Sequence, residues 1–217
     1  MEENEIVEKV EKYIKEQSYN ESSGHDWWHI KRVYNLALKI NEKENADKFT
    51  IEMIALLHDI FDKKFSNGDI RENLIKLLDK MGILKEIDDE KLENILFSIE
   101  NLSFNGGFSK VEISKEGQIV QDSDRIDAIG AIGIARVFAY NGKKGNPIYA
   151  PDVGIIEIKS EEEYRNLKRH AINHFYEKLL KVKDTMNTDE GKNIAIKRTE
   201  YMEEYLKEFY DEWDGKK

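Results

Sequence analysis

Apolar residues recur every three or four positions along most of the chain, and this periodicity predicts an all-α protein. The first predicted helix covers about residues 5–17, where the apolar positions share one face. Further helices are predicted over about residues 26–43, 47–59, 71–81, 88–101, 117–140, 161–182 and 187–213. Asn187 is the predicted N-cap of the last helix, because Glu190 follows it at capping-box spacing.

Two stretches lack this periodicity and are expected to be irregular. Residues 103–118 are rich in Gly and Ser at their start, and residues 141–154 contain both prolines of the chain. The second stretch is a candidate lid. The predicted helix 117–140 includes Gly130 and Gly133, and glycine in a helix costs about 1 kcal/mol relative to alanine. Two such glycines indicate close packing of this helix against a neighbour.

The length and composition fit one globular domain. A chain of 217 residues can bury a substantial core, and its 40% apolar and 36% charged residues are an ordinary balance. We expect a single domain over residues 1–217, with a core of about 22–140 and C-terminal helices of about 160–213 packed on it. The chain has no cysteine, which excludes disulfides, thiolate metal sites and cysteine nucleophiles.

Charge and hydropathy restrict the location and the partners. The acidic N-terminus lacks the basic and apolar regions of a signal peptide, and the apolar run 126–140 is too short to span a bilayer. We therefore predict a cytoplasmic protein. Its formal net charge of −10 predicts no binding to nucleic acid or to membranes. A phosphate substrate would need local positive charge, which a bound cation would supply.

Five histidines are the first candidates for chemistry: His25, His29, His58, His170 and His174. Two pairs have i,i+4 spacing, so on a helix each pair would share a face. The apolar periodicity places His29 and His58 on faces that should turn inward. Such a residue can simply be a core histidine.

Asp59 changes this interpretation, because it places a carboxylate directly after His58 at the end of an apolar run. A buried carboxylate is costly unless it is paired or binds a metal. Asp124 lies within another apolar segment. The predicted metal ligands are therefore two nitrogens and two oxygens, from His29, His58, Asp59 and Asp124. This donor set suits one divalent ion with open positions for water and substrate, with Mn²⁺ preferred and Mg²⁺, Fe²⁺, Ni²⁺, Zn²⁺ or Co²⁺ as alternatives.

The order of these residues resembles the H…HD…D pattern of the HD-domain superfamily of metal-dependent phosphohydrolases. The likeness to one bacterial branch, the YpgQ-like proteins, runs from about residue 5 to 213. It is carried by four blocks, GHDWWHIKRV (24–33), LHDI (57–60), EGQIVQDSDRIDAIGAIGIAR (116–136) and HFYEKLL (174–180). The resemblance implies a compact all-α HD-domain bundle with additional C-terminal helices. It also implies nucleoside triphosphate pyrophosphohydrolase activity with a manganese-type ion.

Two further expectations follow from the resemblance. Several HD families place an acidic residue near the attacking water, and Asp62, four residues after His58, is the matching position. A carboxylate there could accept the proton of that water, although Asp62 could equally be a surface residue at a helix end. Binuclear HD enzymes use extra histidines between the HD pair and the last aspartate. Residues 60–123 contain none, which predicts a single metal ion.

Other residues are weaker candidates for binding substrate or supporting the ligands: His25, Lys63, Lys64, Arg125, Asp127, Arg136 and His174. Arg125 is favoured as a phosphate clamp because it lies in the motif, and Asp127 could orient it or a ligand. A separate metal site at His170 and His174 is disfavoured, because no motif ties a carboxylate to them. Of Trp27 and Trp28, one is expected in the core and the other could stack on a base.

The leading function is hydrolysis of a nucleoside triphosphate to a monophosphate and pyrophosphate. A nucleotide phosphomonoesterase is the second possibility, and a non-catalytic nucleotide-binding signalling module is the third. The sequence leaves open the base and sugar preference, and whether the protein is a monomer or a homodimer.

Overall fold

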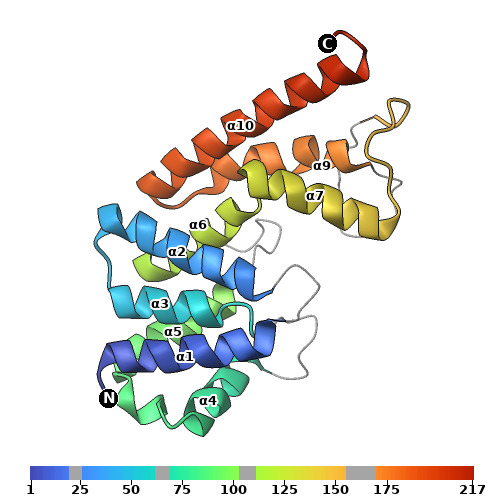
Figure 1. The fold of residues 1–217 in the computed structure, drawn as a ribbon. Coiled ribbons are helices and arrows are strands. Elements are labelled where there is room, and N and C mark those ends of the chain that lie inside the picture. Colours follow the sequence, from blue (N-terminus) through green and yellow to red (C-terminus); the bar gives the residue numbers. More distant parts are fainter. Residues whose placement is uncertain (20–25, 62–68, 103–110, 155–169) are drawn as a thin grey trace. The chain divides into compact units, whose positions relative to one another are not determined.

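The computed structural model describes residues 1–19, 26–61, 69–102, 111–154 and 170–217, and Figure 1 shows its fold. The prediction of an all-α protein is confirmed, because the regular elements in these ranges are all helices. Within the described residues, no helix is long and apolar enough to cross a membrane. The chain divides into two compact units, residues 1–124 and 125–217, and each is described by itself. That the C-terminal helices pack on the core stays a prediction.

The helices of the first unit lie close to their predicted ranges. They are α1 (Glu3–Ser18), α2 (Trp27–Glu44), α3 (Lys48–Leu57), α4 (Ile70–Lys80), the 3₁₀ helix η1 (Leu84–Glu86) and α5 (Asp89–Asn101). Aspartates begin several of them by accepting hydrogen bonds from backbone N–H groups of the first turn. Asp26 caps α2 in this way, Asp47 caps α3, Asp69 caps α4 and Asp88 caps α5.

Helix α3 is the centre of the first unit, and α1, α2 and α5 all pack against it (Figure 1). Every residue of α3 after Lys48 is buried, including Ile51 and Ile54, which are fully inaccessible. Its single acidic residue, Glu52, accepts a hydrogen bond from the Tyr34 hydroxyl of α2 at 2.6 Å. This bond satisfies a buried carboxylate and ties α2 to α3.

The second unit contains α7 (Gly130–Lys144), α9 (Ala171–Glu177), the 3₁₀ helix η2 (Leu179–Thr185) and α10 (Asp189–Trp213). Helix α7 packs against α9 and α10, and η2 packs against both α9 and α10. Aromatic rings fill part of this unit, with the Phe175 ring centroid 6.2 Å from those of Phe138 and Tyr205. The unit thus has an apolar core of its own.

The predicted single helix over residues 117–140 is wrong. The structure has two helices there, α6 (Lys115–Asp127) and α7, separated by Ala128 and Ile129. The chain turns because Ile129 is extended and Gly130 has a φ of 76°, a conformation that favours glycine. The expected close approach does exist, since a Cβ on Gly133 would lie 2.3 Å from the Ala128 carbonyl oxygen.

Several predicted boundaries also differ from the structure. The irregular stretch 103–118 ends earlier, because α6 begins at Lys115, and α7 continues to Lys144 into the stretch predicted to be irregular. The N-cap of α10 is Thr188, whose hydroxyl accepts from the Gly191 N–H at 3.1 Å, and not Asn187. Part of the helix predicted over 161–182 lies outside the described residues, and the rest is split between α9 and η2.

Gly133→Ala should destabilise the protein by about 1–3 kcal/mol, because the added methyl group would overlap the Ala128 carbonyl in a packed turn. Gly142→Ala is the matched control in the same helix, where no atom lies within 4 Å of the added Cβ. It should stabilise by about 0.5–1 kcal/mol through helix propensity. Urea denaturation measures both variants, and equal effects of the two substitutions would contradict the assigned role of Gly133.

Candidate metal centre

Two packed helices bring the predicted histidines together. His29 lies in the first turn of α2, where its N–H binds the Asp26 cap at 2.9 Å, and it is 1% exposed. His58 is the C-cap of α3, and Asp59 follows in the turn after that helix. Helix α2 packs against α3. The ring centroids of His29 and His58 lie 5.4 Å apart, so the start of α2 lies near the end of α3.

The orientation of His58 is set by the backbone of its own helix. Its Nδ1 lies 2.8 Å from the Ala55 carbonyl oxygen. A carbonyl can only accept, so Nδ1 carries the proton and Nε2 keeps its lone pair for a ligand. Ala55 is not among the residues predicted from the sequence, although a carbonyl three residues before a histidine at a helix end is a recognisable signal.

The donor atoms of His29, His58 and Asp59 converge. His29 Nε2 lies 3.4 Å from His58 Nε2 and 3.2 Å from Asp59 Oδ2, and His58 Nε2 lies 3.5 Å from the same oxygen. Ligands about 2.1 Å from a metal ion are spaced by about 3.0–3.4 Å at ordinary coordination angles. The three side chains therefore form a group that could hold a divalent ion.

Asp124 on α6 is the fourth predicted ligand, and its Oδ1 lies 3.4 Å from His29 Nε2. Burial of the carboxyl group raises its pKa, and the hydrogen bond with His29 is the largest of the interactions that lower it. On balance the pKa of Asp124 lies below its ordinary value. The structure thus brings the donor atoms of His29, His58 and Asp59 together, and Asp124 lies beside this group through its contact with His29 alone.

The chemistry of this donor set fits a divalent cation. The side chains of His29 and His58 are 2% and 4% exposed, whereas that of Asp59 is 17% exposed and that of Asp124 is 42% exposed. Two carboxylates beside two imidazoles form a site in which a divalent metal ion would supply compensating positive charge. Nitrogen and oxygen donors together suit Mn²⁺ and the other divalent ions predicted above.

The structure describes only some of the other residues predicted around the metal. His25, Asp62, Lys63 and Lys64 lie outside the described residues. In the second unit, Arg125 Nη1 donates to the Thr185 carbonyl at 2.5 Å. Asp127 accepts from Arg136 Nη1 at 2.5 Å, in a pair whose carboxylate is buried. Their roles toward a substrate stay predictions.

The expectation that His170 and His174 share a helix face is wrong. His170 is the N-cap of α9, outside the helix, and its Nδ1 accepts from the Asn173 N–H at 3.2 Å. Its Nε2 lies 3.2 Å from the Val153 carbonyl oxygen and donates to it. His170 therefore ties the stretch 145–154 to α9. The ligand group found among the described residues includes neither histidine.

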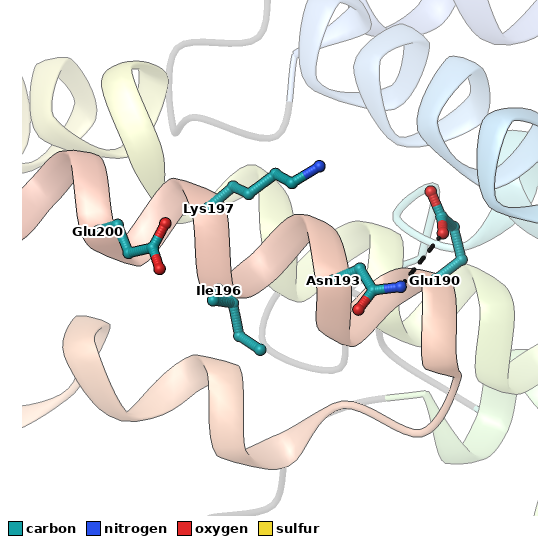
Figure 2. Close-up of a pocket in the computed structure, with 5 residues that line it drawn as sticks. All are labelled: Glu190, Asn193, Ile196, Lys197 and Glu200. Atoms are coloured by element: carbon teal, nitrogen blue, oxygen red, sulfur yellow. Dashed lines mark hydrogen bonds between the residues drawn. The ribbon is translucent and has the colours of Figure 1, made fainter.

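A hollow of about 340 Å³ lies elsewhere, on one side of α10 (Figure 2). Its lining residues all come from that helix: Glu190, Asn193, Ile196, Lys197 and Glu200. Figure 2 shows Asn193 directed at Glu190, to which it donates at 3.5 Å. The hollow contains no histidine, so it offers none of the mixed imidazole and carboxylate donors of the first unit.

Known proteins similar to this chain identify the family to which these histidines and aspartates belong. A model of the HD domain matches residues 27–129, which include the three converging side chains and Asp124. The chain is 35% identical to the uncharacterized protein YpgQ of Bacillus subtilis over 96% of its length and 94% of that protein. The chain belongs to the HD-domain superfamily.

Solved structures of this superfamily cover nearly the whole chain. An HD-superfamily hydrolase from Bacillus thuringiensis is 38% identical, with a TM-score of 0.79 over 98% of this chain and 99% of that one. The crystal structure of Bacillus subtilis YpgQ in complex with ADP is 34% identical, with a TM-score of 0.75 over 98% and 97%. This HD protein is a hydrolase, and the residues that match the family contain the dipeptide His58-Asp59.

His58→Ala and Asp59→Asn should each weaken binding of Mn²⁺ by more than about 100-fold, because loss of a ligand exceeds the 10- to 100-fold effect of a supporting residue. Asp79→Asn, at an exposed carboxylate on α4, is the matched control and should bind like the wild type. Elemental analysis after dialysis and a Mn²⁺-dependent thermal shift measure the effect. Retention of the metal by Asp59→Asn would show that the ligands are misassigned.

Proposed function

We propose that this HD protein hydrolyses nucleoside triphosphates to a monophosphate and pyrophosphate, using one divalent metal ion of the manganese type. The observation that carries the proposal is the convergence of His29, His58 and Asp59, with Asp124 beside His29. The similar YpgQ structure was solved with ADP, which supports a nucleotide as the substrate class.

The metal would be held by His29, His58 and Asp59, with Asp124 as the proposed fourth ligand on the side of His29. When bound, a divalent cation supplies Lewis-acid polarisation of phosphate oxygens and lowers the pKa of a coordinated water. The hydrogen bond from His58 Nδ1 to Ala55 keeps Nε2 directed at the other donors, so little reorganisation is needed. The carboxylates of Asp59 and Asp124 would balance the charge of the cation. The cation would thus cancel negative charges that would otherwise repel a phosphate substrate, in a protein whose net charge is already −10.

Proton transfer needs a group beyond the ligands. Asp62 follows His58 by four residues and lies outside the described part of the chain, and its role as the proton acceptor is part of this proposal. His25, Lys63, Arg125, Asp127 and His174 stay candidates for holding the remaining phosphates or supporting the ligands.

Two other functions use the same ligands and differ in their products. A nucleotide phosphomonoesterase would release orthophosphate, and a signalling module would bind nucleotide without turnover. We favour pyrophosphate release because the sequence blocks 24–33, 57–60, 116–136 and 174–180 together resemble the YpgQ-like branch. The HD dipeptide alone would not distinguish these functions.

The purified protein with Mn²⁺ should convert a panel of ribo- and deoxyribonucleoside triphosphates to monophosphates and pyrophosphate. Product analysis by ion-exchange chromatography and a pyrophosphate-specific assay measure it. Asp59→Asn should lose at least about 100-fold in kcat/KM, since it removes a metal ligand, and Asp79→Asn should keep full activity. Release of orthophosphate alone would replace the proposal by a phosphatase, and binding without turnover would replace it by a sensor.

Asp62→Asn should lower kcat by about 10²–10⁴-fold, because an amide cannot accept the proton of the attacking water. Metal content should remain that of the wild type, since Asp62 is not a predicted ligand. A steady-state assay and elemental analysis of the same preparation separate the two effects. Unchanged kcat in this variant would assign Asp62 to the surface.

A further inference from the structure

The last turn of α6 carries a predicted metal ligand at a place where a helix is least stable. Asp124 is the fourth residue from the end of this helix, which stops at Asp127. The last four carbonyl groups of an α-helix have no partner in a following turn, and helix ends fray unless other groups bind these carbonyls. The position of the Asp124 side chain therefore depends on what holds this turn.

The backbone hydrogen bonds that close this end of α6 are long. The Ala128 N–H donates to the Arg125 carbonyl at 3.2 Å. The Ile129 N–H donates to the Ile126 carbonyl at the same distance. Both bonds span three residues, as in a 3₁₀ helix, whose hydrogen-bond geometry is poorer than that of an α-helix. They lie at the long limit of ordinary N–H···O bonds, so a further donor would stabilise this end.

Arg198 of α10 supplies such a donor. Its Nη1 donates to the Ile126 carbonyl at 2.8 Å, so this carbonyl accepts from a guanidinium group as well as from the Ile129 N–H. Hydrogen bonds from a charged donor are stronger than those between neutral groups. A cation at the C-terminal end of a helix also interacts favourably with the helix dipole. Arg198 is therefore a C-terminal cap of α6 that comes from another helix.

The aliphatic stem of Arg198 lies against Gly130. A Cβ on this glycine would lie 3.0, 3.1 and 3.2 Å from Cγ, Cδ and Cβ of Arg198. The absence of a side chain at Gly130 thus leaves room for the arginine stem, in addition to permitting the positive φ of the turn. A polar and an apolar contact therefore hold the same side chain at the end of α6. These contacts lie within the second unit, and α6 continues from them without a break to Asp124.

We propose that Arg198 is a positioning residue for the metal centre and acts through the backbone of α6. The carbonyl that it binds lies two residues after Asp124, in the same turn. By keeping this turn helical, Arg198 keeps Asp124 Oδ1 at its distance of 3.4 Å from His29 Nε2. The inference rests on the proposed function only in that Asp124 is taken as the fourth ligand. In this role Arg198 needs no contact with the metal or the substrate.

A loosened last turn of α6 would displace one ligand and leave the other three. His29 belongs to α2, His58 caps the end of α3 and Asp59 follows it, so the convergence of their donor atoms does not depend on α6. Loss of the Arg198 cap should therefore weaken metal binding without abolishing it.

Arg198→Met, which keeps an aliphatic stem and removes the guanidinium group, should raise the Kd for Mn²⁺ by about tenfold, the lower end of the effect of a residue that supports a ligand. Arg198→Lys keeps a cationic donor and should recover part of the loss. Lys207→Met, at an exposed lysine of the same helix, is the matched control and should bind like the wild type. Calorimetric titration of the metal-free proteins with Mn²⁺ measures Kd, and urea denaturation checks that each variant folds. Arg198→Gln replaces Arg198→Met if the latter does not fold.

A double-mutant cycle with Asp124→Asn separates positioning of this ligand from a general structural role. If Arg198 acts through Asp124, Arg198→Met should weaken Mn²⁺ binding no further in the Asp124→Asn background. The same tenfold loss in that background, an unchanged Kd in Arg198→Met, or wild-type affinity of Asp124→Asn would each overturn the inference. A wild-type protein that binds Mn²⁺ and releases no pyrophosphate would instead overturn the proposed function, and the cycle would still test Arg198.

Discussion

The contact of Asp59 with two imidazoles is the constraint on which the candidate site depends. One carboxylate oxygen lies 3.2 Å from His29 Nε2 and 3.5 Å from His58 Nε2, although His29 belongs to a different helix. These distances require the start of α2 to lie at the end of α3. The buried face of α3 and the Tyr34–Glu52 hydrogen bond fix that arrangement, so the apolar core of the first unit sets the geometry of its polar site.

The same contact couples metal binding to stability. The carboxylates of Asp59 and Asp124 both contact the nearly inaccessible His29. Bringing two negative charges together in a partly buried site costs free energy unless a positive charge compensates them. A bound divalent cation compensates it in the folded protein and has no preformed site in the unfolded chain. Occupancy therefore raises the free energy of unfolding by the binding free energy at the prevailing metal concentration. The residues that would perform chemistry also contribute to holding α2, α3 and α6 together.

The sequence predicted the helices well, and it singled out three side chains whose donor atoms converge, for identifiable reasons. Aspartates at positions 26, 47, 69 and 88 mark helix starts chemically, and the apolar stripes that follow have helical period. Asp59 stood out because an acid beside a buried histidine needs compensation. The break between α6 and α7 was missed because it depends on the positive φ of Gly130 and on the close approach of Gly133 to the Ala128 carbonyl, which no periodicity records. His170 was assigned to a helix face because an imidazole is an unusual N-cap.

The two nitrogen donors of the site are buried, whereas the two carboxylates are more exposed. His29 and His58 are almost inaccessible, Asp59 is slightly open and Asp124 is 42% exposed. A cation bound here would be held by nitrogen donors on its buried side, where their orientation is fixed by the Asp26 cap and the Ala55 carbonyl. A structural site fills its coordination sphere with protein ligands, whereas a catalytic site leaves part of it accessible to water and substrate. The partial exposure of the two carboxylates beside buried imidazoles therefore favours a hydrolytic role for the metal over a purely structural one.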